Sequence, residues 1–193
     1  MNIKSIIIFA SGSGTNAENI IRFFEKREDV EIPLILSNRK DAFVHTRARK
    51  MGVKSESFTK EEFKSPEFTE RIKKTGADLI VLAGFLWLIP PKIIDKFPNR
   101  IINLHPALLP KYGGKGMYGM NVHKAVIENG EKESGISIHY VNEKYDEGNI
   151  IFQARCPVEP DETPESLAAK IHKLEYKYFP KVIDEVLKNR NQS

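Results

Sequence analysis

The start of the chain joins an apolar strand pattern, a glycine-rich turn and an amphipathic helix, and this unit constrains the fold most strongly. Residues 3–9 form an apolar, β-branched run, and residues 16–24 place apolar side chains at helical spacing. The same two kinds of segment then alternate, with strands expected at 30–36, 53–58, 78–83 and 101–104 and helices at 42–51 and 66–75. This alternation predicts an α/β fold that is Rossmann-like, with an open, mostly parallel twisted sheet and helices on both faces.

The last third of the chain has a different pattern. Two strand-like runs at 136–141 and 149–156 are joined by a polar loop, which predicts antiparallel strands near the C-terminal end. A long helix follows from Pro164, and Pro180 is expected to kink it or to divide it in two. Because the 193 residues contain no internal repeat and no linker-like stretch, we expect residues 1–193 to form a single domain.

The composition argues against several classes of protein, namely disulfide-bonded, membrane-spanning, secreted and nucleic-acid-binding proteins. The only cysteine, Cys156, excludes an internal disulfide and a cysteine zinc cluster, and we expect it to serve in packing. The longest apolar run, 79–90, is too short to span a bilayer, and the first residues lack a signal-peptide pattern. The net charge of +4 is spread along the chain without a basic tract. These features predict a cytoplasmic protein that binds neither nucleic acid nor membrane.

The glycine loop after the first strand has the pattern of an anion site. Gly12 and Gly14 allow the backbone to approach a ligand, and the N–H groups of the following helix favour a phosphate. Thr15 and Asn16 add side-chain donors. The alternative is a tight turn in which Asn16 caps the helix.

The same loop also fits a weak dinucleotide fingerprint. Gly12, Gly14 and Ala17 match the spacing G-x-G-x-x-G/A. An NAD site requires an acidic residue at the end of the second strand, where this chain has Ser37, Asn38 and Arg39. The absence of an acidic residue there disfavours NAD. Because an arginine such as Arg39 is able to pair with the 2′-phosphate of NADP, an NADP-binding oxidoreductase stays open as an alternative.

The strand that ends at Pro106 carries the most informative residues. Alternation places Asn103 and His105 on the same face, near the carboxyl end of the strand. An amide can donate to a developing oxyanion, and an imidazole can transfer a proton near neutral pH. The alternative is a structural histidine beside an asparagine that caps a turn.

Asp146 lies in the polar loop, and periodicity does not place it. If it meets His105, its charge favours the imidazolium and raises the histidine pKa; otherwise it is a turn residue. His105, His139 and Asp146 also fit the composition of a two-histidine, one-carboxylate metal site. We give that interpretation little weight and expect no metal.

The segment from Asn103 to Tyr112, Asn-Leu-His-Pro-Ala-Leu-Leu-Pro-Lys-Tyr, resembles the signature of the folate-dependent formyltransferases. The glycine loop, the strand around His139 and Asp146 extend the resemblance over essentially the whole chain. It implies that the amine of glycinamide ribonucleotide attacks the formyl carbon of 10-formyltetrahydrofolate, the co-substrate, in purine synthesis.

The resemblance also implies a role for each site residue. Asn103 matches the residue that binds the formyl oxygen, and His105 matches the proton donor. Asp146 matches the carboxylate that raises the histidine pKa, which displaces its interpretation as a turn residue. His139 matches a supporting position near the site.

Substrate contacts follow from the same resemblance. Gly14, Thr15 and Asn16 match the phosphate cradle, and Glu175 matches the carboxylate that holds the ribose hydroxyls. Glu175 also lies close to the apolar stripe of the last helix, where a carboxylate requires a partner or access to water. His172, one turn earlier, faces either the phosphate or solvent. The implied folate contacts are Leu86, Trp87, Leu88, Ile89, Asn103 and Val141.

Three features depart from the family pattern. Trp87 stands where a basic or smaller residue is frequent, and the basic contact to the folate glutamate tail has no clear match. The segment 113–119 is longer and richer in glycine than the corresponding family segment. It is interpreted either as a mobile flap over the nucleotide or as a surface loop. Less favoured alternatives are a 10-formyltetrahydrofolate hydrolase, a transfer-RNA formyltransferase and an inactive nucleotide-binding module. We expect a monomer or weak homodimer.

Overall fold

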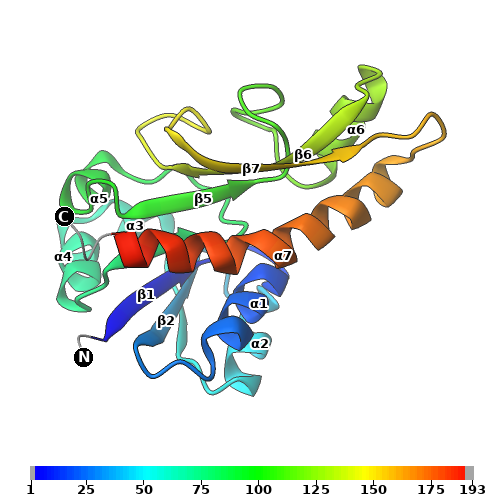
Figure 1. Cartoon of the computed structure of the whole chain (residues 1–193). Coiled ribbons are helices and arrows are strands. Elements are labelled where there is room, and N and C mark those ends of the chain that lie inside the picture. Colours follow the sequence, from blue (N-terminus) through cyan, green and yellow to red (C-terminus); the bar gives the residue numbers. More distant parts are fainter. Residues whose placement is uncertain (1–2, 190–193) are drawn as a thin grey trace.

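A computed structural model of the chain describes residues 3–189, in which seven strands form one sheet in the order β3-β2-β1-β4-β5-β6-β7 (Figure 1). The strands are β1 (Lys4–Phe9), β2 (Val30–Ser37), β3 (Ser55–Ser57), β4 (Leu79–Leu82), β5 (Ile101–His105), β6 (Glu133–Tyr140) and β7 (Ile150–Pro157). The first five strands pair in parallel, and β6 and β7 join the sheet antiparallel. The predicted fold class is confirmed.

The helices connect and cover these strands. They are α1 (Thr15–Phe24), α2 (Val44–Lys50), α3 (Lys60–Lys64), α4 (Pro66–Lys74), α5 (Pro91–Lys96), α6 (Met120–Glu128) and α7 (Pro164–Asn189). Helices α3, α5 and α6 were not predicted from the sequence, and α3 and α5 have only five and six residues. No helix within residues 3–189 combines the length and apolar character needed to cross a membrane.

Helix α7 continues through Pro180, so the expectation that this proline divides the helix is wrong (Figure 1). A proline inside a helix removes one backbone hydrogen bond. Here the ring is buried, and apolar residues of α7 pack into the core both before and after it. That packing stabilises the helix on both sides of the proline.

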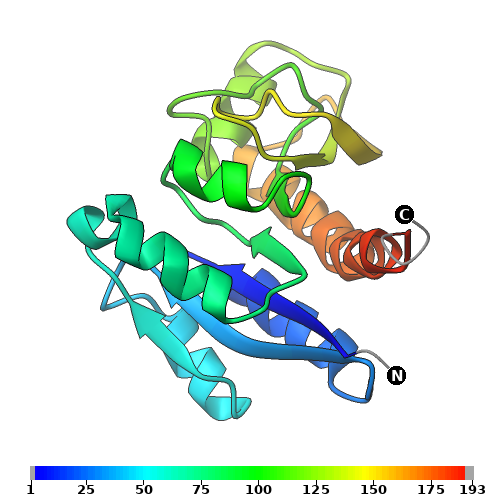
Figure 2. The same ribbon diagram turned by 90° about the vertical axis from the view of Figure 1, so that its left-hand side faces the viewer.

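Each face of the sheet has its own core. Ile6 and Ile8 of β1 pack with α1, α2 and α7, whereas Ile7 and Phe9 pack with α3, α4 and α5. Figure 2 shows α7 (orange to red) and α4 (teal) on opposite sides of the central strands. Burial on both faces explains why β1 is apolar at successive positions. Cys156 in β7 is half-buried against the first core, as expected of a packing residue.

The strand order positions the functional site. After β1 the chain builds β2 and β3 on one side, then returns to build β4 and β5 on the other. The carboxyl ends of β1 and β4 therefore flank a topological switch point, where open α/β sheets bind ligands. The glycine loop follows β1, residues 83–89 follow β4, and Asn103 and His105 end β5.

Candidate active site

A pocket of about 500 Å³ opens at this edge of the sheet, and all the predicted site residues line it. They are Gly14, Thr15, Asn16, Leu86, Trp87, Leu88, Ile89, Asn103, His105, His139, Val141, Asp146 and Glu175. Pockets of this size suit a small-molecule ligand. The topology thus brings together residues that the sequence separates by most of its length.

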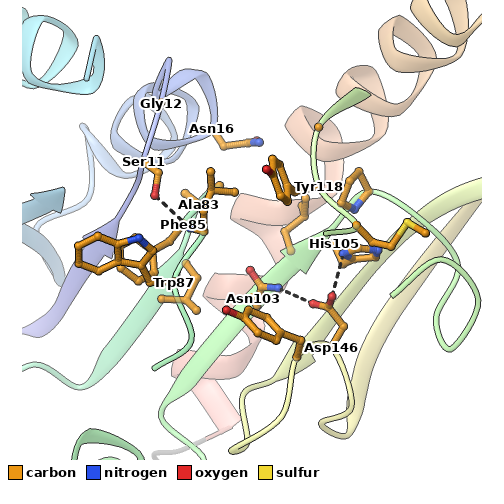
Figure 3. Close-up of a pocket in the computed structure, with 18 of the residues that line it drawn as sticks. Ser11, Gly12, Asn16, Ala83, Phe85, Trp87, Asn103, His105, Tyr118 and Asp146 are labelled. Atoms are coloured by element: carbon orange, nitrogen blue, oxygen red, sulfur yellow. Dashed lines mark hydrogen bonds and ion pairs between the residues drawn. The ribbon is translucent and has the colours of Figure 1, made fainter. Parts of the chain in front are cut away.

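The imidazole of His105 is buried, and a polar group of the protein lies near each of its nitrogens. Its Nε2 lies 2.7 Å from the carbonyl oxygen of Tyr112. Because a carbonyl only accepts, Nε2 carries the hydrogen and donates it. Nδ1 lies 3.5 Å from Oδ2 of Asp146 (Figure 3). Nδ1 is therefore the nitrogen that gains or loses a proton within the pocket.

Burial decides the pKa of His105. Removal from water lowers this pKa below its ordinary value, although the Asp146 charge and the Tyr112 carbonyl both act to raise it. The expectation that Asp146 acts to raise the pKa of His105 is confirmed for this one contribution, but the net shift is downward. The carboxylate acts in the expected direction, but desolvation of the ring outweighs it. The ring is neutral at neutral pH.

Asp146 reaches His105 from an unusual backbone conformation. Its φ of 56° is in the left-handed region, which aspartate tolerates better than most residues. Oδ2 accepts the backbone N–H of Gly114 at 3.0 Å. Burial acts to raise the pKa of Asp146, but the nearby His139 and His105 and the Gly114 N–H together lower it. Asp146 is a carboxylate at neutral pH.

Asn103 is fixed by two acceptors. Its Nδ2 donates to Nε2 of His139 at 3.1 Å and to Oδ1 of Asp146 at 3.3 Å. Nδ1 of His139 lies 2.9 Å from the carbonyl oxygen of Tyr140 and so donates, and in the neutral ring this leaves Nε2 as the acceptor. Both N–H groups of Asn103 thus have protein partners. To donate to an oxyanion, Asn103 must break one of these two hydrogen bonds. The bond to Asp146 is the longer of the two and therefore the easier to break.

The cluster contains the two histidines and one carboxylate that the sequence analysis considered as a metal site. Within residues 3–189, no group of histidine, cysteine and acidic side chains is arranged to hold a metal ion, and this includes His105, His139 and Asp146. The expectation of a metal-free site stays a prediction.

The glycine loop is held tightly at the start of α1. Gly14 has a φ of 74°, and a Cβ at this position would lie 2.5 Å from a methyl carbon of Val44. Arg47 donates from Nε to the carbonyl of Ser13 at 2.8 Å. Gly14 itself is the N-cap of α1, without a side-chain cap, so the interpretation of Asn16 as a helix cap is wrong. The start of α1 keeps the geometry of an anion site.

Glu175 is buried on α7 and joins two parts of the pocket. Its Oε2 accepts from Nδ2 of Asn16 at 2.8 Å and lies 2.9 Å from Nδ1 of His172. Hydrogen bonding to Glu175 raises the pKa of His172. The partner that this carboxylate requires is therefore supplied within the protein, and His172 lines the pocket beside it.

The segment after β4 forms an apolar shelf at the other end of the pocket. Leu86 and Leu88 are exposed, whereas Ile89 is part of the core. Ser11 accepts the backbone N–H of Leu86 at 3.0 Å, which ties this segment to the glycine loop (Figure 3). Trp87 is half-buried and packs against the rings of Phe58, Phe63 and Phe85.

Arg39 and the glycine-rich segment bear on questions that the sequence left open. Arg39 lines the pocket, and its guanidinium pairs with Asp41 at 3.0 Å. Residues 114–119 of the glycine-rich segment also line the pocket, and the side chain of Tyr118 among them is half-exposed. The glycine-rich segment therefore borders the site, whether it is a mobile flap or a surface loop.

His123 is a polar pocket residue that the sequence analysis did not identify. His123 is buried on α6 and lines the pocket, but α6 itself was not predicted. The available signal was the pair Val122 and Val126, spaced one helical turn apart after the glycine-rich segment.

Comparison with known proteins agrees with this geometry. Residues 4–183 match the family model described as formyl transferase. A chloroplastic phosphoribosylglycinamide formyltransferase of Arabidopsis thaliana is 39% identical over 97% of this chain, which spans 66% of that protein. A phosphoribosylglycinamide formyltransferase of Haemophilus influenzae is 33% identical, covering 94% of this chain and 86% of that protein.

A solved structure shows the same fold. Glycinamide ribonucleotide transformylase 1 of Symbiobacterium toebii superposes with a TM-score of 0.84 at 34% identity, covering 94% of this chain and 86% of that one. The chain therefore belongs to the formyl transferase family.

Proposed function

We propose that the protein transfers a formyl group from 10-formyltetrahydrofolate to the amine of glycinamide ribonucleotide. The products are formylglycinamide ribonucleotide and tetrahydrofolate, in de novo purine (IMP) biosynthesis. One observation carries the proposal: Asn103, His105 and Asp146 meet between an anion-binding loop and an apolar shelf in a single pocket. The names of the relatives support the same reaction.

The two ends of the pocket suit the two substrates. The phosphate binds at Gly14, Thr15 and Asn16, where the start of α1 favours negative charge. Glu175, beside Asn16, accepts from the ribose hydroxyls. The flat pterin packs on the apolar shelf of residues 86–89 and on Val141. The amine and the formyl carbon then meet at the catalytic cluster.

The chemistry follows from the hydrogen bonds of the cluster. Attack by the amine forms a C–N bond and gives an ammonium and an oxyanion. Nδ1 of His105 takes a proton from the ammonium and passes it to N10 of the folate as the C–N10 bond breaks. Asp146 stabilises the imidazolium in between, and Asn103 donates to the oxyanion. One oxyanion donor contributes about 10²–10³ in rate and proton transfer roughly 10²–10⁴.

An absorbance assay of folate deformylation, with and without glycinamide ribonucleotide, tests the proposal. Tetrahydrofolate is expected only when the nucleotide is present. Release without nucleotide indicates a 10-formyltetrahydrofolate hydrolase. Absence of release in both reactions, with a folded protein, contradicts formyl transfer and favours an NADP-binding oxidoreductase or an inactive nucleotide-binding module.

Several expectations stay predictions. They are a single domain, a cytoplasmic location, a monomer or weak homodimer, and the absence of metal, nucleic-acid and membrane partners. The Arabidopsis relative is named as chloroplastic, so location in particular requires its own measurement.

A further inference from the structure

Two residues of α2 hold the carbonyl groups of the glycine loop. The backbone N–H of Val44 donates to the carbonyl of Gly12 at 3.1 Å, and Nε of Arg47 donates to the carbonyl of Ser13 at 2.8 Å. Gly12, Ser13 and Gly14 line the pocket, whereas Val44 and Arg47 lie outside its lining. Helix α2 therefore acts on the loop and not on the contents of the pocket.

These two bonds set the direction of the N–H groups that follow. The peptide bonds of the loop are trans, and a trans peptide points its N–H opposite to its C=O. The N–H groups of Ser13 and Gly14 therefore point away from the groups of α2 that hold the preceding carbonyls. Neither N–H has a hydrogen-bond partner within residues 3–189. Successive free N–H groups of this kind form a concavity that suits an anion.

The guanidinium of Arg47 is held on three sides. Nε donates to the Ser13 carbonyl, Nη1 pairs with Glu18 of α1, and Cζ lies 5.1 Å from the centre of the Phe43 ring. Only 27% of the Arg47 side chain is exposed. A planar guanidinium suits such a set of partners, because it donates in fixed directions and stacks on aromatic rings. One side chain thus joins α2, α1 and the loop.

The peptide between Ser13 and Gly14 requires such an anchor. Glycine adopts positive and negative φ about equally, so Gly14 does not by itself fix the orientation of this peptide plane. A plane turned over would present the Ser13 carbonyl oxygen in place of the Gly14 N–H. The partial negative charge of that oxygen would repel a phosphate.

We propose that Arg47 is a positioning residue for the nucleotide phosphate. It holds the Ser13 carbonyl against α2, so that the N–H groups of Ser13 and Gly14 face the phosphate. The proposal rests on the proposed function, which supplies the phosphate. Because Arg47 does not line the pocket, it acts on nucleotide binding and not on the transfer of the formyl group.

Calorimetry with ribose 5-phosphate tests the role, since this probe carries the phosphate and the ribose alone. Arg47→Met keeps an unbranched apolar chain and loses the guanidinium. We expect the Kd of ribose 5-phosphate to rise about tenfold. In the complete reaction, the KM for the nucleotide is expected to rise by a similar factor while kcat stays within about twofold.

Arg22→Met is the matched control. Arg22 pairs with the same Glu18 at 2.7 Å, but its side-chain hydrogen bonds within residues 3–189 go to Glu18 alone and it lies outside the pocket lining. This variant is expected to bind ribose 5-phosphate as the unaltered protein does. Equal weakening in Arg22→Met and Arg47→Met overturns the role, because loss of any partner of Glu18 would then suffice.

Arg47→Lys separates hydrogen-bond geometry from charge. Lysine keeps the positive charge but lacks the planar fork that binds Ser13 and Glu18 together. We expect Arg47→Lys to bind ribose 5-phosphate nearly as weakly as Arg47→Met. Full recovery of affinity in Arg47→Lys overturns the role, because the charge alone would then account for binding.

The remaining outcomes separate this proposal from the proposed function. Unchanged affinity in Arg47→Met, or a fall in kcat at constant nucleotide KM, overturns the role of Arg47. If the unaltered protein does not bind ribose 5-phosphate, the phosphate assignment and the role of Arg47 fail together. If it binds ribose 5-phosphate but transfers no formyl group, the proposed function fails, and the same titrations still decide the role of Arg47.

NMR of the unaltered protein gives a readout that does not depend on the folding of a variant. The backbone amide resonances of Ser13 and Gly14 are expected to shift with ribose 5-phosphate. The Nε–H of Arg47 is expected to exchange with solvent more slowly than that of Arg49, an exposed arginine of the same helix. Unshifted amides, or equally fast exchange of the two arginines, overturn the role.

Discussion

The Asp146 carboxylate lies 3.5 Å from Nδ1 of His105, the ring nitrogen that faces away from Tyr112. The opposite nitrogen, Nε2, is committed to the carbonyl of Tyr112 at 2.7 Å. Tyr112 and Asp146 both have positive φ, 57° and 56°. The Tyr112 carbonyl thus fixes the tautomer of the neutral catalytic ring, and the residues that face its two nitrogens both have strained backbone conformations, which are typical of active sites.

Asp146→Asn tests this relationship through the pH profile. The Asp146 charge acts to raise the pKa of His105, so its removal lowers that pKa further. Because neutral Nδ1 takes the proton, kcat/KM rises with pH through the pKa of His105, and in the variant this acidic limb moves to lower pH. We expect the plateau of kcat/KM to fall by about 10²–10⁴.

Rate profiles and an NMR titration of His105 check both effects. Glu147→Gln is the control, since this neighbouring carboxylate is exposed, pairs with Lys144 and lies outside the pocket lining. An acidic limb that stays in place in Asp146→Asn contradicts the assignment.

Gly14→Ala tests the fit of the phosphate loop. An alanine here must adopt a φ of 74° and place its Cβ 2.5 Å from Val44. We expect the free energy of unfolding to fall by about 1–3 kcal/mol, measured by denaturant titration. Gly12→Ala is the matched control, because a Cβ at Gly12 meets nothing within 4 Å, and its expected change is below about 0.5 kcal/mol. Equal stability of the two variants shows that the loop is not tightly packed.

Glu175→Gln tests the ribose assignment. The substitution weakens the acceptor for the ribose hydroxyls and the bond from Asn16, so the KM for the nucleotide is expected to rise about tenfold with little change in kcat. The pKa of His172 is expected to fall, because Glu175 raises it. Steady-state kinetics and NMR titration measure the two effects. An unchanged nucleotide KM rejects the assignment.

Trp87 supplies a direct report on the folate end of the pocket. It is the only tryptophan of the chain, and it is half-buried on the shelf where the pterin is proposed to bind. A stable folate analogue without a transferable formyl group is expected to change its fluorescence, since stacking alters the surroundings of the indole. Ribose 5-phosphate is expected to leave the fluorescence nearly unchanged. A fluorescence change with ribose 5-phosphate but not with the folate analogue would show that the nucleotide, and not the pterin, binds at the Trp87 end of the pocket.

Local pattern was enough to predict the parts of the site that lie on regular strands. Alternation placed Asn103 and His105 on one face of β5, and the observed strand ends at His105 as the pattern requires. The glycine loop was likewise found from its place between β1 and α1. These features depend on residues within a few positions of one another.

Long-range geometry was beyond local pattern. Asp146 reaches His105 through a loop with positive φ, and periodicity carries no information about such a loop. The partners of Glu175 lie on α1 and on its own helix, and the bond to Asn16 forms only when α7 packs against α1. The pKa of His105 depends mainly on burial of the ring by the assembled fold, and the sequence predicted only the smaller, opposite effect of the Asp146 charge.

The most direct test of formyl transfer follows the formyl carbon itself. Folate carrying a ¹³C-labelled formyl group is mixed with glycinamide ribonucleotide and excess protein, and NMR records where the label goes. The label is expected to move from N10 of the folate to the amine of the nucleotide, and His105→Asn is expected to slow this step by about 10²–10⁴. Appearance of the label as free formate, or transfer at the same rate in the variant, would contradict formyl transfer through His105.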